Sequence, residues 1–336
     1  MARFEIAKDR IITVFGGSGF LGRYVVRSLA QRGWRVRVAS RRPDLAFHLQ
    51  PLGRVGQIHA VQANLRYPAS LAAAMRGSDA VVNLVGILAE AGQQNFETVH
   101  VSGTRAIARA AKDHGIGALL QVSAIGADAK GASAYARTKA AAEAAAREIL
   151  PETMVVRPSI LFGPEDDFFN RFAALARISP VMPLIGGGTT RFQPAYVGDV
   201  AEAIARSLEG AATPGVTYEL GGPEILTFEQ ILRYICAETG RKRAMVSIPA
   251  GLASGPAALS EVINGLTLGA LPSMFQLTRD QLKLLEQDNV VSAAATTAGH
   301  TFAGLGIQPQ TVEAITPTYL YRFRKTGQFD RTRQTV

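Results

Sequence analysis

The sequence contains a single cysteine, Cys236, and this excludes two features that require several cysteines. An internal disulfide needs two cysteines, and a zinc site built from thiolates needs more than one. Cys236 stands among apolar residues at helical spacing, including Ile231, Leu232 and Ile235, which predicts a buried and unreactive thiol. We therefore expect a soluble protein of a reducing compartment with no metal site.

Long apolar runs are also missing. No stretch of about 20 uncharged apolar residues is present, so the sequence predicts no membrane-spanning helix. Residues 1–9 are mixed in character, and we expect neither a secretory signal peptide nor an Arg/Ser-rich mitochondrial leader. The 336 residues are enough for one large domain or for two that share a core.

Acidic residues are outnumbered by basic ones. The 36 Lys and Arg stand against 27 Asp and Glu, which gives a formal net charge of +9. This balance suits an anionic cofactor, an acidic partner or a membrane surface. Nucleic acid is not expected as a partner, because the positive residues are scattered and no basic–aromatic stripe is present.

The most informative motif is a glycine cluster near the start of the chain. An apolar, β-branched run over residues 11–15 ends at Gly16, and Gly19 and Gly22 follow at three-residue spacing. An amphipathic segment comes next, so we predict a strand, a tight turn and a helix N-terminus. Glycine leaves room for a ligand at the backbone, and the free N–H groups of a helix start attract a pyrophosphate. A plain strand–helix turn has the same spacing, but this context favours a nucleotide site.

The end of the second predicted strand, residues 35–40, indicates which dinucleotide binds. An acidic residue there would bind the ribose 2′-hydroxyl of NAD, whereas an arginine accommodates the 2′-phosphate of NADP. Arg41 and Arg42 stand at this place, and guanidinium groups pair with phosphate in a planar fork. The sequence therefore predicts NADP(H), with solvated surface arginines as the alternative interpretation.

Strand and helix patterns alternate through the first half of the chain. Apolar strand patterns lie at residues 58–65, 80–86 and 118–124, with helical patterns between them. This alternation predicts an α/β fold with a Rossmann-type, doubly wound parallel sheet. We expect this dinucleotide-binding domain over residues 1–163. A smaller C-terminal α/β lobe interleaved with it would span 164–318, and a basic tail would span 319–336.

Three side chains form a candidate catalytic group. Tyr135 and Lys139 are four residues apart at the start of an alanine-rich helical segment, so they share one helix face. A lysine beside a tyrosine favours the phenolate and lowers the tyrosine pKa, which suits proton transfer near neutral pH. Ser123, at the end of a predicted strand, is placed to hold a substrate oxygen. The Tyr–Lys spacing alone occurs by chance on many helices.

Taken together, these motifs resemble the short-chain dehydrogenase/reductase superfamily in its extended and atypical branches. The resemblance rests on residues 16–22, 83–86, the Ser123, Tyr135 and Lys139 set, and 157–163, which is similar to the loop that closes over the nicotinamide. It implies that Tyr135 is the acid/base, that Lys139 binds the nicotinamide ribose, and that Ser123 orients substrate.

The resemblance also implies a set of cofactor contacts. Asn64 departs from the aspartate that is common beside the adenine, although its amide can still hydrogen-bond. With the two arginines included, the predicted contacts are Gly16, Ser18, Gly19, Phe20, Leu21, Gly22, Arg41, Arg42, Asn64, Leu65, Val85, Gly86, Tyr135, Lys139, Pro158, Ser159 and Ile160.

The whole chain is similar to one family, the nucleotide-binding accessory subunits of respiratory complex I (NADH:ubiquinone oxidoreductase). The more particular segments are 160–172, 193–200, 277–281 and 305–309. The resemblance implies a tightly held NADPH with a structural role, no established turnover, and attachment to other complex I subunits. It also implies a peripheral position on the cytoplasmic face of a bacterial inner membrane, or on the matrix side for a processed organellar member.

Two segments of the second half leave alternatives open. Residues 244–277 contain one charged residue, Glu261, and suit either the core of the smaller lobe or an exposed docking face. The basic, aromatic end of the chain suits an anionic membrane surface, a large partner or a solvated tail. Because Tyr135 and Lys139 are retained, the alternative function is a free NADP-dependent reductase, or an epimerase/dehydratase, acting on a small carbonyl or sugar substrate.

Overall fold

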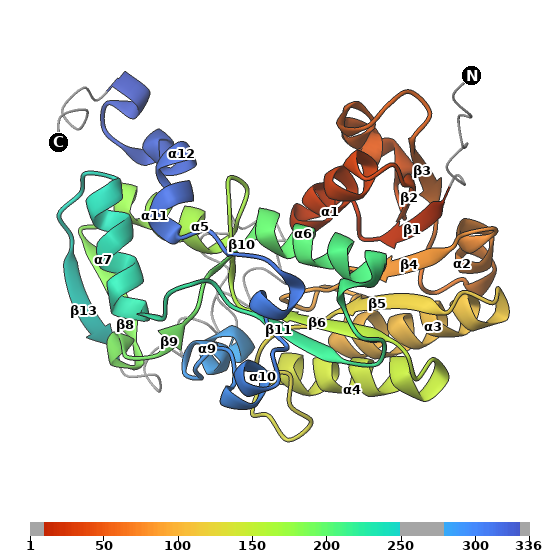
Figure 1. The fold of residues 1–336 in the computed structure, drawn as a ribbon. Helices are drawn as coiled ribbons and strands as arrows, with labels where there is room; N and C mark the ends of the chain where they lie inside the picture. The colour runs from red at the N-terminus through yellow and green to blue at the C-terminus, as the bar shows by residue number, and fades with distance from the viewer. Residues whose placement is uncertain (1–9, 249–278, 330–336) are drawn as a thin grey trace.

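A parallel sheet forms the larger of two lobes in the computed structural model, which describes residues 10–248 and 279–329 (Figure 1). In these ranges the sheet has seven strands: β1 (Ile11–Phe15), β2 (Arg35–Ser40), β3 (Ile58–Gln62), β4 (Ala80–Asn83), β5 (Ala118–Val122), β6 (Met154–Pro158) and β11 (Thr217–Leu220). Their order is β11-β6-β5-β4-β1-β2-β3, and every neighbouring pair is parallel. The chain order reverses between β1 and β4, and such a switch point is where doubly wound sheets bind ligands.

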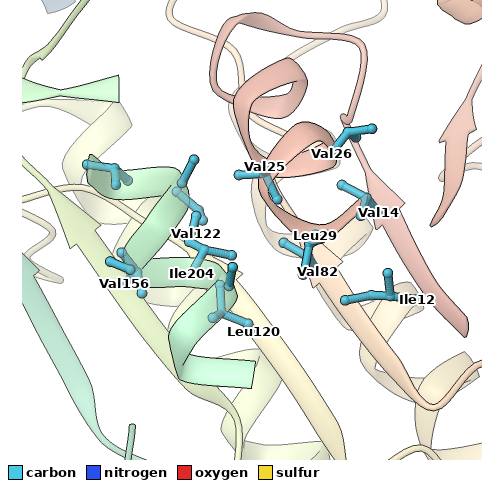
Figure 2. Close-up of a cluster of buried hydrophobic side chains, with 14 of the residues drawn as sticks. Ile12, Val14, Val25, Val26, Leu29, Val82, Leu120, Val122, Val156 and Ile204 are labelled. Carbon is cyan, nitrogen blue, oxygen red and sulfur yellow. The ribbon is translucent and has the colours of Figure 1, made fainter. Parts of the chain in front are cut away.

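Helices cover both faces of this sheet, so its strands are almost continuously apolar. On one face, α1 (Phe20–Gln31) packs beside α6 (Val197–Arg206). Figure 2 shows α1 side chains such as Leu29 facing Ile12 and Val14, and Ile204 of α6 facing Leu120. The other face carries α2 (Pro68–Met75), α3 (Gly103–Asp113) and α4 (Ala134–Ile149). The predicted Rossmann-type fold is therefore confirmed.

The larger lobe draws on both halves of the sequence. Strand β11 and helix α6 both follow residue 163, yet β11 pairs with β6 and α6 packs on α1. The two lobes are thus interleaved along the chain. The domain limits at residues 163 and 318 remain a prediction from the sequence. The strand predicted over 58–65 is shorter than expected and ends at Gln62. The chain turns at Asn64, whose carbonyl accepts a hydrogen bond from the Tyr67 N–H.

The smaller lobe is organised around a cluster of phenylalanine side chains. In the described residues its helices are α5 (Phe168–Ile178), α7 (Phe228–Glu238), α9 (Arg279–Leu285), α11 (Val312–Ile315) and α12 (Pro317–Leu320). Helix α10 (Ala293–Thr297) begins beside β11 of the larger lobe, where the N–H of its N-cap, Ser292, donates to Glu219. Short strands pair β7 (Leu161–Phe162) with β10 (Ala195–Tyr196), β9 (Arg191–Phe192) with β12 (Leu226–Thr227), and β8 (Val181–Ile185) with β13 (Ala244–Ile248). Phe169, Phe172 and Phe228 pack together, and the Cys236 thiol is buried beside them, as predicted.

The predicted basic tail begins inside this lobe. Tyr319 and Leu320 are buried in its core, and the Tyr319 hydroxyl donates a hydrogen bond to Asp166 at 2.7 Å. Arg322 donates to the carbonyl of Pro164 and to the side chain of Asn170. A solvated tail from residue 319 is therefore wrong, because apolar packing fixes these first residues. Arg331 and Arg333 lie outside the described residues.

Most of the apolar segment at 244–277 also lies outside the described residues. Its first five residues form β13, which pairs with β8 in the smaller lobe. Within the described ranges, none of the helices is long and apolar enough to cross a membrane.

Candidate functional site

The turn between β1 and α1 is built so that only glycine fits at its closest approach. A Cβ on Gly22 would lie 2.3 Å from the Gly16 carbonyl oxygen and 2.6 Å from the Gly17 backbone. Gly16 itself has a φ of 78°, a conformation that other residues rarely adopt. Gly19 supplies no side-chain cap to α1, so the N–H groups of Phe20, Leu21 and Gly22 are available to an anion. The turn is thus a cradle for a phosphate group.

A cavity of about 270 Å³ opens beside this turn, at the carboxyl ends of β1 to β4. It lies at the point where the strand order reverses. A Cβ on Gly16 would be 3.1 Å from the backbone of Leu84, so the two strand ends meet closely there. The predicted contacts that line the cavity are Gly16, Ser18, Arg41, Asn64, Leu65, Val85 and Gly86. The other predicted contacts, Gly19, Phe20, Leu21, Gly22, Arg42, Tyr135, Lys139, Pro158, Ser159 and Ile160, lie outside its lining.

The structure separates the two predicted arginines. Arg41 lines the cavity beside Ser40. Arg42 instead forms a two-pronged ion pair with Asp44, with Nε at 3.0 Å and Nη2 at 2.7 Å from the carboxylate oxygens. This ion pair lowers the pKa of Asp44. Of these two arginines, only Arg41 lines the cavity.

A second arginine at the cavity was missed by the sequence reasoning. Arg66 lines the cavity and donates two hydrogen bonds of 2.7 Å to Gln93, one to its side chain and one to its carbonyl. These bonds join the loop after β3 to the loop after β4 above the cavity. The only signal in the sequence is a positive residue two positions after Asn64.

The reductase-like residues gather next to the cavity, around the start of α4. Lys139 is buried, and its ammonium lies 5.7 Å from the centre of the Tyr135 ring and donates to the Val122 carbonyl at 3.4 Å. A Cβ on Gly86 would be 3.2 Å from this ammonium, so Lys139 reaches the turn that lines the cavity. Ser123 follows Val122, and its buried hydroxyl has no hydrogen-bond partner in the described part of the chain.

Burial sets the protonation state of this group. It raises the pKa of Tyr135 to about 12 and lowers the pKa of Lys139 to about 8, the latter opposed by Glu143. The expected lowering of the tyrosine pKa is therefore wrong. Loss of water around the hydroxyl disfavours the charged phenolate and so raises the pKa. Near neutral pH the phenol is protonated, so it can donate a proton but is not a ready base.

His100 is a further site residue that the sequence reasoning missed. It is fully buried in a π-helical turn, Glu97–Ser102, and such turns often mark functional positions. Its Nε2 accepts the Ile87 N–H at 3.1 Å, so Nδ1 carries the proton and donates to the Thr138 hydroxyl at 3.0 Å. His100 thereby joins the cavity-lining turn after β4 to α4. Burial and the nearby Lys139 charge lower its pKa to about 3.

This histidine makes stability depend on pH. In the unfolded chain its pKa is about 6.5, so from about pH 6.5 down to about pH 3 only the unfolded state binds the proton. We expect the free energy of unfolding to fall with decreasing pH by roughly 1.4 kcal/mol per unit in this window. His100→Gln keeps an acceptor for Ile87 but cannot titrate. Urea unfolding at several pH values should show the wild-type advantage over His100→Gln shrinking as pH falls.

Because the wild type is compared with His100→Gln, the contributions of all other titrating groups to the pH dependence cancel. Burial raises the pKa of Asp166 to about 6, which contributes a pH slope of opposite sign but is common to both proteins. Unfolding curves that stay parallel across the pH range would contradict the assignment of His100 as a neutral, buried acceptor.

These features define a class of protein. A Rossmann-type, reductase-like protein that binds a dinucleotide has these features: a glycine turn at the switch point of a parallel sheet, a cavity beside this turn, and a Tyr–Lys pair at the edge of the cavity. The chain belongs to the NAD dependent epimerase/dehydratase family, which matches residues 12–221.

The relatives divide into respiratory subunits and reductases. The chain is 35% identical over 320 residues to subunit 9 of the mitochondrial NADH dehydrogenase (ubiquinone) 1 alpha subcomplex of Arabidopsis thaliana, covering 94% of this chain and 79% of that protein. It is 30% identical over 289 residues to a ceramide reductase of Caulobacter vibrioides, covering 86% and 88%. The NADPH-dependent quinone oxidoreductase QOR2 of Escherichia coli, solved with NADPH, shares the fold. Its TM-score is 0.69 at 20% identity, over 89% of this chain and 96% of that one.

Proposed function

We propose that this chain is a nucleotide-binding accessory subunit of a respiratory NADH:ubiquinone oxidoreductase and holds NADPH as a structural element. The observation that carries the proposal is the 35% identity to such a subunit over 94% of the chain. This similarity extends through both lobes, whereas the family match ends at residue 221. The part of the chain beyond the nucleotide-binding core therefore supports the subunit assignment.

The residues present fit NADPH. The glycine cradle at Gly16–Gly22 takes the pyrophosphate, and Arg41 takes the 2′-phosphate of the adenosine ribose. Asn64 and Leu65 border the adenine part of the cavity. In this proposal Val85, Gly86, Tyr135 and Lys139 contact the nicotinamide ribose, which is supported by the approach of the Lys139 ammonium to Gly86 at the cavity. When bound, NADPH supplies a hydride, but the buried hydroxyl of Ser123, which would orient a substrate, favours retention over turnover.

The partners and location follow from the same assignment. As an accessory subunit, the chain contacts other subunits of the complex at the cytoplasmic face of the bacterial inner membrane, or at the matrix side in an organelle. The excess of positive charge and the basic end of the chain support an additional contact with an anionic lipid surface. We also keep the limits at residues 163 and 318 as working limits along the sequence, with Tyr319 and Leu320 packed in the smaller lobe.

Native purification from membranes tests this function. The chain is expected to co-migrate with the subunits of NADH:ubiquinone oxidoreductase after mild detergent extraction, and deletion of its gene should reduce the yield of the intact complex. Recovery only as a free soluble protein, with the complex assembled normally in the deletion strain, would contradict the proposal.

A second candidate function is a free NADP-dependent reductase, or an epimerase/dehydratase, for a small carbonyl or sugar substrate. It is favoured by one observation, the gathering of Ser123, Tyr135 and Lys139 beside the cavity, and by the similarity to a ceramide reductase. The two functions differ in what Tyr135→Phe does. A reductase loses its turnover, whereas a structural subunit keeps its nucleotide and its place in the complex.

A further inference from the structure

A segment from the second half of the chain lies across the side of the site where a substrate would enter. We call residues 280–291 the closing segment; it comprises most of α9 and the residues that lead to α10. Gln281 at its start donates to the Leu88 carbonyl, which follows β4, at 3.2 Å. Asn289 near its end donates to the Ile125 carbonyl, which follows β5, at 3.1 Å. The closing segment thus spans the carboxyl ends of neighbouring strands (Figure 1).

Asp280 fixes the helix that carries the reductase-like pair. Its two carboxylate oxygens accept the N–H groups of Ala134 and Tyr135 at 2.8 and 3.0 Å. The next N–H, that of Ala136, is capped by Ser133 at 3.0 Å. A negative charge is favourable at a helix N-terminus, so Asp280 satisfies both the hydrogen bonds and the dipole of α4. The start of α4 is therefore held from a point 145 residues further along the chain.

Asn289 fixes the loop after β6 in the same way. Its Oδ1 accepts the Ser159 hydroxyl at 2.6 Å and the Ile160 N–H at 3.0 Å. Its backbone N–H donates to Arg191, and its carbonyl accepts the Gln193 N–H. The donors of Ser159 and Ile160, which were predicted to contact the cofactor, are thus satisfied within the chain.

The shape of the cavity agrees with a closed substrate side. Its lining comes from β1 to β4, the loops that follow them and the start of the next helix, and includes no residue of α4 or of the loops after β5 and β6. Ser123, which a substrate would have to reach, is buried with its hydroxyl unpartnered among the described residues. The open part of the site is the adenosine side.

We propose that the closing segment takes the place of a substrate, and that Asp280 and Asn289 are positioning residues that hold α4 and the 158–160 loop against the bound nucleotide. This inference rests on the proposed function, because it explains how NADPH is retained. Loss of the Asp280 side chain frees two backbone N–H groups of α4. Loss of the Asn289 side chain frees the Ile160 N–H and leaves the Ser159 hydroxyl only the Asn289 carbonyl, so that α4 or the 158–160 loop can move away. The nucleotide then exchanges faster and becomes accessible to solutes.

Nucleotide release from the full-length chain tests the proposal. The wild type, Asp280→Ala and Asn289→Ala are loaded with NADPH, and its fluorescence is followed during a chase with excess NADP⁺ and during iodide quenching. Because each variant loses two or more hydrogen bonds, release should accelerate by about tenfold or more, and iodide should quench the nicotinamide more strongly. Asp280→Asn keeps one acceptor oxygen and should give an intermediate rate.

The matched control is Glu286→Ala, which makes the same charge change in an exposed side chain near the end of α9. Its release rate and quenching should equal those of the wild type, and release should be measured well below the melting temperature of every variant. If the wild type retains NADPH and neither Asp280→Ala nor Asn289→Ala speeds its release or exposes it to iodide, the closing segment has no such role. If the wild type itself fails to retain NADPH, the proposed function fails instead.

Discussion

Arg41→Asp is expected to weaken NADPH binding by on the order of 100-fold while leaving NADH binding within a few-fold of the wild type. Arg41 is the arginine that lines the cavity at the end of β2, where the 2′-phosphate of NADPH would lie. The substitution removes a charge-assisted hydrogen bond and places a carboxylate against the phosphate. The same carboxylate is suited to the ribose 2′-hydroxyl of NADH, so NADPH binding should fall far more than NADH binding.

The adjacent arginine supplies the control for this experiment. Arg42 is paired with Asp44 and does not line the cavity, so Arg42→Asp should leave the ratio of the NADPH and NADH dissociation constants close to that of the wild type. Isothermal titration of both cofactors against the nucleotide-free wild type and the two variants gives the six dissociation constants needed. An equal loss for NADPH and NADH in Arg41→Asp would show that the 2′-phosphate assignment is wrong.

Gly22→Ala is expected to abolish retention of NADPH and to lower the free energy of unfolding by about 3 kcal/mol. The added Cβ would lie 2.3 Å from the Gly16 carbonyl oxygen, which is a backbone atom and cannot rotate away. The start of α1 would have to move off the turn, and the N–H groups that cradle the pyrophosphate would move with it. Thermal unfolding and nucleotide content after desalting measure both effects.

Gly117→Ala is the appropriate comparison, because it introduces the same methyl group where no atom lies within 4 Å. It should keep wild-type nucleotide content and change the melting temperature little. A Gly22→Ala protein with wild-type stability and bound NADPH would mean that α1 does not pack on the glycine turn as described.

The core of the nucleotide-binding half could be predicted from sequence because its signals are local. Strands β1 and β2 have the predicted bounds: β1 is a short apolar run that ends at Gly16, and β2 alternates polar residues with buried valines. The glycine spacing located the turn for the same reason. The capping box of Thr227 and Gln230 at the start of α7 is likewise a local signal, since its two residues are three positions apart.

The parts that escaped prediction depend on partners far apart in the sequence. Asp280 caps a helix that begins at residue 134, and Asn289 holds Ser159, so neither could be recognised from its neighbours. The pKa of Tyr135 was predicted in the wrong direction because the lysine is visible in the sequence while burial is not. Arg42 is different, since its partner Asp44 is two residues away and that ion pair could have been anticipated.

The nucleotide content of the intact respiratory complex tests the central claim most directly. The complex that contains this chain would be purified from membranes, supplied with NADH and quinone, and denatured before and after many turnovers so that released nucleotides can be quantified. NADPH is expected in an amount equimolar with this chain, unchanged in quantity and oxidation state by turnover. Absence of NADPH from the complex, or its oxidation in step with quinone reduction, would contradict the central claim.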